Sequence, residues 1–297
     1  MDVLVSGATG LVGSELSKEL ENKGHRVIVL SRSKPSSENT VRWDPSRGQI
    51  DASRLEGIDA VVHLAGENIV GRWTEEKKRR IRDSRVQGTR LLAETIAGLS
   101  DKPRAMVCAS AIHYYGDRGN ELLREDSEPG NAFLSGVVEE WEAAAEPARE
   151  AGIRVANLRF GIVLSPEGGA LGTTLPLFKL GGGGKVGSGR QWWSWVALDD
   201  VTGALVHALE DDSLEGPVNV VAPNPMTNAE YTKVLGDVLN RPTLVPAPAP
   251  ALRAVLGQVA DELLLASVRV EPAQLKETGY GFRQPELEPA LRHLLNR

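Results

Sequence analysis

Short apolar runs alternate with helical segments along the first 160 residues. Runs rich in β-branched and other apolar residues, which favour strands, occupy Val3–Ser6, His25–Leu30, Val41–Trp43, Ala60–Ala65, Arg104–Ser110 and Ile153–Leu158. Helical periodicity is found between them, from Leu11 to Leu20, over Thr74–Leu99 and over Leu134–Ala151. Strands that are apolar throughout and alternate with helices are typical of a parallel sheet covered on both faces. The pattern therefore predicts an α/β fold, a Rossmann-type doubly wound sheet.

The composition of the chain and the regularity of its hydrophobic pattern change after Gly161. Residues Ser165–Gly189 are rich in glycine, and two more regular stretches follow at Val196–Glu210 and Pro217–Val221. A proline-rich segment, Pro242–Pro250, then leads to an apolar helix-like tail, Leu252–Leu265. We expect Asp199 and Asp200 to cap a helix that starts near Val201. The domain prediction is a Rossmann domain of residues 1–165, to which 196–221 return, and a smaller C-terminal lobe of 166–195 and 222–297.

A glycine-rich turn directly follows the first predicted strand and opens the first helix. It reads Gly7-Ala8-Thr9-Gly10-Leu11-Val12-Gly13. We expect Gly7 to permit a tight turn, Gly10 to let the backbone approach a pyrophosphate, and Gly13 to let the helix pack on the strand. The helix N-terminus offers unpaired N–H groups and a positive dipole end to phosphates. The seven residues are therefore predicted to bind a dinucleotide.

An arginine, not a carboxylate, stands at the end of the second strand. Enzymes that use NAD usually place Asp or Glu about 20 residues past the glycines, where it binds the ribose 2′-hydroxyl. Here Ser31 and Arg32 occupy that place, and Arg32 comes 19 residues after Gly13. Arginine can hold a 2′-phosphate bidentately, and Ser31 can donate a further hydrogen bond. The sequence predicts NADP(H); the alternative is an exposed loop arginine.

Further candidate cofactor contacts lie near the end of the strand that finishes at Leu64 and Ala65. Small residues at this edge leave room for a ligand. Glu67 either lies beside the nicotinamide ribose or caps the next element. Arg85 shares a helix face with sheet-packing residues. It therefore needs an anion, either a cofactor phosphate or Glu67, unless it extends past the sheet edge to solvent.

Composition narrows the range of partners. The net charge of −6 argues against a nucleic-acid binder, which needs a basic face; the basic run Lys77–Arg80 is interpreted as a solvated helix start. Cys108 is the only cysteine, and no His/Cys spacing suggests a metal. No apolar run approaches a membrane span, and the N-terminus lacks the basic region of a signal peptide. We expect a cytoplasmic protein with a small-molecule substrate; a homodimer is left open.

Several segments together resemble a known family. They are the glycine turn, His63-Leu64-Ala65-Gly66-Glu67-Asn68-Ile69, Gly88-Thr89, Ser110 with Tyr115-Gly116, Trp141-Glu142-Ala143-Ala144, and Gly279-Tyr280. They look like an extended (atypical) short-chain dehydrogenase/reductase of the NAD-dependent epimerase/dehydratase superfamily, in the little-characterised "epimerase family protein" branch with its small C-terminal domain. The resemblance implies NADP(H) contacts at the glycine turn and at Ser31, Arg32, Leu64, Ala65, Arg85 and Val163.

One feature of that superfamily is missing. Its catalytic members use a Tyr-x-x-x-Lys pair on the helix after the fifth strand, where the tyrosine moves the substrate proton and the lysine lowers its pKa. Counting back from Trp141-Glu142, the two positions hold Leu134 and Val138, and the chain contains no Tyr-x-x-x-Lys. The usual proton relay is therefore absent.

Ser110 and Tyr114 are the candidate catalytic residues that remain, with His113 and Tyr115 beside them. Ser110 is able to hydrogen-bond a substrate carbonyl or hydroxyl, and Tyr114 to donate a proton. The alternative is that Ser110 only ends a strand and that Tyr115-Gly116 shapes the loop.

Two functions follow from the sequence. The first is an NADP(H)-dependent oxidoreductase that acts on a small carbonyl or alcohol. The second is a protein that binds NADP(H) without turnover and serves as a redox sensor or scaffold. The tryptophans Trp192, Trp193 and Trp195 are expected to pack in the core or between lobes, or else to stack on a planar substrate.

Overall fold

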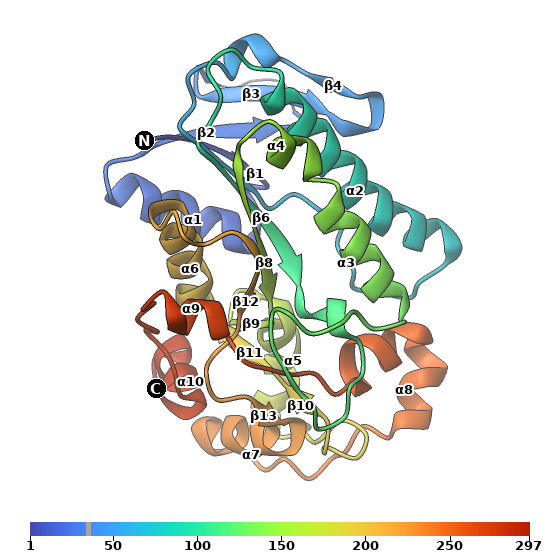
Figure 1. Ribbon diagram of the computed structural model, residues 1–297. Coiled ribbons are helices and arrows are strands. Elements are labelled where there is room, and N and C mark those ends of the chain that lie inside the picture. The colour runs from blue at the N-terminus through green and yellow to red at the C-terminus, as the bar shows by residue number, and fades with distance from the viewer. Residues whose placement is uncertain (34–36) are drawn as a thin grey trace.

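A computed structural model describes residues 1–33 and 37–297 of the chain, and an eight-stranded sheet forms its centre (Figure 1). In spatial order the strands are β12 (Gly216–Val220), β8 (Arg154–Phe160), β6 (Ala105–Ala111), β5 (Ala60–His63), β1 (Asp2–Ser6), β2 (Arg26–Ser31), β3 (Thr40–Asp44) and β4 (Gln49–Ile50). Neighbouring strands are parallel, except that β3 and β4 are antiparallel. The predicted parallel sheet is confirmed.

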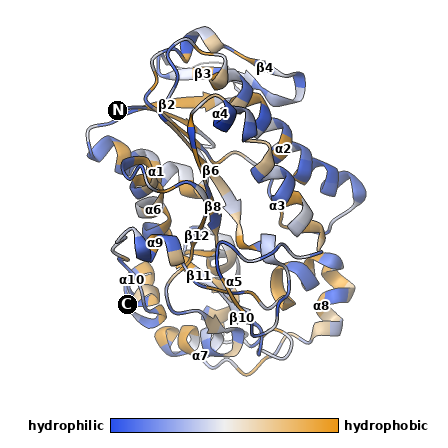
Figure 2. Ribbon diagram, viewed as in Figure 1, coloured by the Kyte–Doolittle hydropathy of each residue, from blue (hydrophilic) through white to orange (hydrophobic). Residues whose placement is uncertain are grey.

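Helices cover both faces of this sheet. One face packs against α1 (Leu11–Asn22) and α6 (Leu198–Glu210), and the other against α2 (Glu75–Ala97), α3 (Phe133–Ala143) and α4 (Glu146–Glu150). In Figure 2, β2 is coloured hydrophobic and α2 is mostly hydrophilic, as expected where amphipathic helices cover an apolar sheet. The order of the strands, with β1 in the middle and crossovers to both sides, is that of a doubly wound fold.

The remaining smaller elements come mostly from residues beyond β8, and several of them surround a separate apolar cluster. The strands are β7 (Leu122–Leu123) with β14 (Arg269–Val270), β9 (Ile162–Ser165) with β11 (Trp195–Ala197), and β10 (Trp192–Trp193) with β13 (Met226–Thr227). The helices are α5 (Gly169–Lys179), α7 (Asn228–Leu239), α8 (Ala249–Leu256), α9 (Ala273–Glu277) and α10 (Leu287–Leu295). Short turns are η1 (Pro45–Arg47), η2 (Ala52–Arg54), η3 (Ile112–Tyr115) and the π-helical η4 (Ala260–Leu265). Among the described residues, no helix combines the length and apolarity needed to cross a membrane.

Two predicted helices are each interrupted. The segment Leu134–Ala151 forms α3 and α4, because Pro147 has no N–H to donate and would clash with a carbonyl of a continuous helix. The tail Leu252–Leu265 is broken at Gly257, whose φ of 63° ends α8. The alternation of apolar and polar positions does not register such breaks, so the predicted helices were too long.

The prediction for Asp199 and Asp200 was wrong. Helix α6 begins at Leu198, so both residues lie inside its first turn instead of before it. Asp200 is buried and accepts hydrogen bonds from the backbone N–H groups of Arg283 (2.7 Å) and Gln284 (2.9 Å). Its carboxylate therefore fastens the C-terminal part of the chain to α6.

The three neighbouring tryptophans have different environments. Trp193 and Trp195 are buried in the apolar cluster, which agrees with the expected core role. Trp192 keeps part of its surface, donates its indole N–H to the Asn120 side chain (2.9 Å), and has the Arg269 guanidinium 4.4 Å from its ring centre. Two of the three are thus core residues.

Candidate functional site

The turn between β1 and α1 is closed by backbone atoms, so it depends on its glycines. Gly7 has a φ of 71°, in the region that favours glycine. A Cβ atom on Gly13 would lie 2.2 Å from the Gly7 carbonyl oxygen and 2.8 Å from the Ala8 Cα. Gly13 therefore makes room for the turn itself, not for helix–strand packing as predicted. At Gly10 the only atom of the described chain within 4 Å of a Cβ would be the Gly7 oxygen, at 3.3 Å, and the residue is exposed.

The first turn of α1 is open to an anion. Gly10 is its N-cap, no side chain caps it, and it holds no acidic residue. The Ser14 N–H donates to the Gly10 carbonyl (2.9 Å), whereas the N–H groups of Leu11, Val12 and Gly13 have no acceptor in the described part of the chain. Unpaired N–H groups and the positive helix end suit a phosphate. The turn fits the predicted pyrophosphate.

Ser6 ties the ends of two strands together beside this turn. Its hydroxyl oxygen accepts hydrogen bonds from the backbone N–H groups of Leu64 (3.1 Å) and Ala65 (3.2 Å), and lies 2.7 Å from His63 Nδ1. A Cβ on Gly7 would lie 2.9 Å from the Leu64 carbonyl carbon. The end of β5 therefore contacts the glycine turn directly, as the cofactor prediction for Leu64 and Ala65 requires.

The end of β2 lies on the other side of the turn. Ser6 is in register with Leu30, so Ser31 and Arg32 follow next to Gly7. Arg32 is exposed, and it has no hydrogen-bond or ion-pair partner in residues 1–33 and 37–297. The guanidinium is therefore accessible beside the predicted phosphate site.

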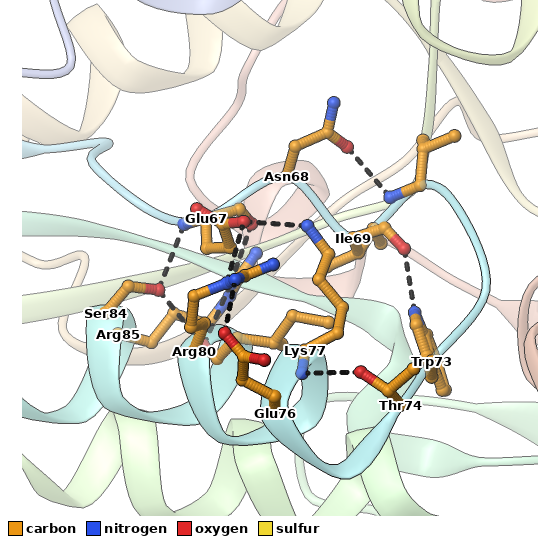
Figure 3. A network of polar contacts seen from close by, with 12 residues as sticks. Glu67, Asn68, Ile69, Trp73, Thr74, Glu76, Lys77, Arg80, Ser84 and Arg85 are labelled. Atoms are coloured by element: carbon orange, nitrogen blue, oxygen red, sulfur yellow. Dashed lines mark hydrogen bonds and ion pairs between the residues drawn. The ribbon is translucent and has the colours of Figure 1, made fainter.

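Glu67 is held by basic residues of α2 (Figure 3). Lys77 Nζ lies 2.7 Å from the carboxylate, and Arg80 Nε lies 3.7 Å away. The hydrogen bond from Lys77 is the main cause that lowers the Glu67 pKa, with smaller contributions from the charges of Arg80 and Arg32. The Lys77 side chain is only 15% exposed, so the basic run is not simply solvated. The carboxylate thus neither caps an element nor is free.

Arg85 anchors the loop that follows β5. Its Nη1 donates to the carbonyl oxygens of Glu67 and Ile81, both at 3.1 Å, and its guanidinium lies 5.0 Å from the Trp141 ring centre. Burial lowers the Arg85 pKa to about 10, and Glu67 opposes this shift. Arg85 thus binds backbone carbonyl oxygens and not the Glu67 carboxylate, which is paired with Lys77. The N–H groups of Arg85 Nε and Nη2 have no partner in the described chain.

Val163 lies on β9, in register with Val196 of β11. The chain after β9 returns to the glycine turn, since a Cβ on Gly168 would be 3.5 Å from the Leu11 side chain. The structure thus brings the β9–α5 segment and the start of α1 together.

Ser110 is the penultimate residue of β6 and lies beside a buried ion pair. Its hydroxyl donates to Glu142 Oε1 (2.5 Å), and Glu142 also accepts two hydrogen bonds from Arg159, both at 2.8 Å. Ser110 is only 3% exposed. Its hydroxyl proton is therefore engaged by a carboxylate of α3.

Arg159, the cation of this ion pair, also contacts both tyrosines of η3. Its Nη1 donates to the Tyr115 hydroxyl (2.9 Å), which donates to Asn219 (2.7 Å), and its guanidinium lies 3.6 Å from the Tyr114 ring centre. Burial opposes the charge of Arg159, but the hydrogen bonds and charge of Glu142 outweigh it and raise the Arg159 pKa. Burial raises the Tyr115 pKa to about 12.

Sequence reasoning assigned no role to Glu142 or Arg159. In the sequence, Arg159 directly follows the predicted apolar strand Ile153–Leu158, and a buried charge there needs a partner. The partner lies on a helix earlier in the chain, and nothing in the local pattern identifies it.

We expect Arg159→Met to destabilise the fold by about 3–5 kcal/mol, because it leaves Glu142 buried and unpaired. Arg82→Met is the matched control: its pair with Glu140 is about half exposed, and its loss should cost under about 1 kcal/mol. Urea unfolding of the two variants measures both values. Equal losses would contradict the structural role of the buried pair.

The positions of the missing Tyr-x-x-x-Lys pair lie on α3. Leu134 and Val138 are both buried. The helix has no capping side chain of its own; the Glu262 carboxylate accepts from the N–H groups of Phe133 (3.3 Å) and Leu134 (2.8 Å). A C-terminal residue thus caps the helix that lacks the usual proton-transfer groups.

Comparison with known proteins agrees with this architecture. The family model described as "NAD dependent epimerase/dehydratase family" matches residues 3–222, and "Domain of unknown function (DUF1731)" matches residues 247–294. An epimerase family protein of Mycobacterium bovis is 38% identical, with 99% of this chain and 98% of that protein covered; one of Bacillus subtilis is 34% identical, with the same coverage.

A solved structure is similar over the full length. The crystal structure of the human epimerase family protein SDR39U1 (isoform 2) with NADPH is 37% identical, with a TM-score of 0.92 and 100% of both chains covered. The sequence-based resemblance is confirmed, and so is the small C-terminal domain that it implied. The chain belongs to the NAD dependent epimerase/dehydratase family.

Proposed function

We propose that this protein is an NADP(H)-dependent oxidoreductase that acts on a small carbonyl or alcohol. The observation that carries the proposal is the open first turn of α1 with the accessible Arg32 beside it. The pyrophosphate would lie on the N–H groups of residues 11–13, and the 2′-phosphate on Arg32 and Ser31. The bound nicotinamide would supply or accept the hydride.

The relative solved with NADPH supports this choice of cofactor. The loop after β5 contains Leu64 and Ala65, lies against the glycine turn and is bound by Arg85 of α2. The segment around Val163 also lies close to the glycine turn. Glu67 is a weaker candidate contact, because its carboxylate is engaged by Lys77. The test is a titration with NADPH and NADH, followed by the oxidation of NADPH with a panel of ketones and aldehydes.

A second candidate is a non-catalytic NADP(H)-binding protein that senses redox state or acts as a scaffold. The observation that favours it is the replacement of the Tyr and Lys positions by the buried Leu134 and Val138. Tight NADPH binding without oxidation by any carbonyl of the panel would favour this second function over the first.

Ser110 and Tyr114 are the candidate catalytic residues from the sequence, and both contact the Glu142–Arg159 pair. We expect Ser110→Ala to lower turnover, because the variant has no hydroxyl to hydrogen-bond the carbonyl or hydroxyl oxygen of the substrate. The measurement is kcat at a temperature where wild type and variant are both folded. Full retention of kcat would remove Ser110 from the mechanism, and Tyr114→Phe tests the second residue in the same assay.

Two further expectations remain proposals. The first is the division of the chain into a Rossmann domain of residues 1–165 and 196–221 and a smaller lobe of residues 166–195 and 222–297. The other is a cytoplasmic location; a relative from Arabidopsis thaliana is named chloroplastic, so relatives differ in this respect.

A further inference from the structure

His113 lies in η3, directly after β6, at the carboxyl edge of the sheet. β6 neighbours β5, and β5 neighbours β1. With strands about 4.8 Å apart, the end of β6 is about 10 Å from the glycine turn. A dinucleotide with its pyrophosphate at β1 and its adenosine half toward Arg32 on β2 extends its nicotinamide half over β5 and β6. His113 thus stands at the reacting end.

The imidazole ring of His113 differs from those of the other four histidines in its hydrogen bonds. A ring nitrogen of each of the four others lies within hydrogen-bond distance of a partner: His25 with the N-terminus, His63 with Ser6, His207 with Thr278, and His293 with Asp199. Neither nitrogen of His113 has a partner in the described chain, and the residue keeps some exposed surface. The polar ring atoms are therefore available to a ligand.

The backbone at His113 is held firmly. Its carbonyl oxygen accepts hydrogen bonds from the Ser135 hydroxyl (2.9 Å) and from the Gly116 N–H (3.2 Å). Ser135 belongs to the first turn of α3, next to Leu134, where the family's tyrosine would stand. The imidazole is thus carried by a fixed turn against the helix that lacks its proton-transfer group.

The electrostatic surroundings keep the ring neutral. Burial lowers the His113 pKa to about 4, and the positive charge of Arg85 on α2 adds to this. On α3, Glu142 is bound to Ser110 and Arg159, and Glu139 and Glu140 are exposed. A neutral imidazole carries one N–H donor and one acceptor nitrogen.

Tyr114 has a different environment from that of His113. The Tyr114 ring stacks on Arg159 and packs with the cluster that contains Val268 and Val270. Arg159 lies on β8, which is on the side of β6 away from β5, so its contact directs the Tyr114 ring away from β5. Of the two residues, His113 is therefore the one whose ring atoms are available to the nicotinamide half that we expect over β5 and β6.

We propose that His113 is a catalytic residue, whose neutral imidazole donates its N–H to the oxygen of a ketone or aldehyde substrate in place of the absent tyrosine. The proposal rests on the proposed oxidoreductase function. The carbonyl carbon gains a C–H bond with the hydride from NADPH, which becomes NADP⁺. The C=O π pair moves to the oxygen, which takes the imidazole N–H proton, and a proton from the solvent then restores the N–H. Neutral histidines can polarise carbonyls in this way.

The first test is a magnetic-resonance comparison of the histidine rings in two complexes. One contains NADP⁺ and the other 2′-phospho-ADP-ribose, which lacks the nicotinamide. We expect the ring nitrogen signals of His113 to differ between the two complexes, whereas those of His293, a control on α10, stay the same. Identical His113 signals in both complexes would overturn the proposal. Failure of both nucleotides to bind would instead refute the proposed function.

The second test uses variants and the oxidation of NADPH by a panel of ketones and aldehydes. We expect His113→Phe to retain its affinity for NADPH and to lose about a hundredfold or more in kcat, the usual range for a lost proton donor. His113→Gln, which keeps an N–H donor, should recover part of the rate, and His207→Phe is the matched control. A wild-type kcat in His113→Phe would overturn the proposal.

Discussion

Gly10→Val is expected to abolish NADPH binding while the protein stays folded. The backbone at Gly10 is extended (φ −81°, ψ 174°), and a Cβ there meets only the Gly7 carbonyl oxygen, at 3.3 Å. The added side chain would instead cover the open N–H groups of the first turn, where the pyrophosphate needs close approach. We expect the affinity for NADPH to fall at least about a hundredfold, equivalent to some 2.7 kcal/mol. Isothermal titration measures the affinity, and thermal unfolding checks the fold.

Gly13→Ala, in the same turn, is expected to affect folding as well as binding, in contrast to Gly10→Val. Its Cβ would overlap the Gly7 carbonyl, so we expect this variant to lose about 1–3 kcal/mol of stability as well as affinity. Gly281→Ala is the control, because no atom of residues 1–33 and 37–297 lies within 4 Å of a Cβ at that position. An unchanged NADPH titration for Gly10→Val would contradict the placement of the pyrophosphate.

Arg32→Glu is expected to erase the preference for NADPH over NADH. The wild-type guanidinium is accessible at the end of β2, and a charge-assisted bidentate contact to the 2′-phosphate adds about 1.5–3 kcal/mol. A carboxylate in its place repels that phosphate and is able to accept from a ribose hydroxyl. We expect the ratio of the two Kd values to change by about a hundredfold.

Arg90→Glu provides the matched control for this change of charge. Arg90 is half exposed on α2 and lies 3.9 Å from Glu94. The two variants alter the net charge equally, so a general electrostatic effect would appear in both. Loss of preference in Arg90→Glu as well as Arg32→Glu would contradict a specific contact at Arg32.

The fold was predictable because its strands are buried on both sides. Each sheet strand in the middle of the molecule is an apolar run, and such runs leave a strong signal even in one sequence. The glycine turn was found for a similar reason, since its spacing reflects local backbone contacts at Gly7 and Gly13. Local signals of this kind do not depend on distant parts of the chain.

The side-chain network of the site was not predictable in the same way. Glu142 meets Arg159 and Ser110 only because α3 packs against β6, where Ser110 is in register with Arg159 of the neighbouring β8. Glu67 meets Lys77 only because the loop after β5 folds back on the start of α2, as Figure 3 shows. The sequence identified groups that need partners, but tertiary packing decides which partner each group receives.

The most direct measurement is the affinity of the wild-type protein for NADPH and for NADH, determined by titration in the same buffer. We expect NADPH to bind at least about tenfold more tightly than NADH, which corresponds to a contact of some 1.4 kcal/mol with the extra phosphate. Equal affinities, or no binding of either nucleotide, would contradict it.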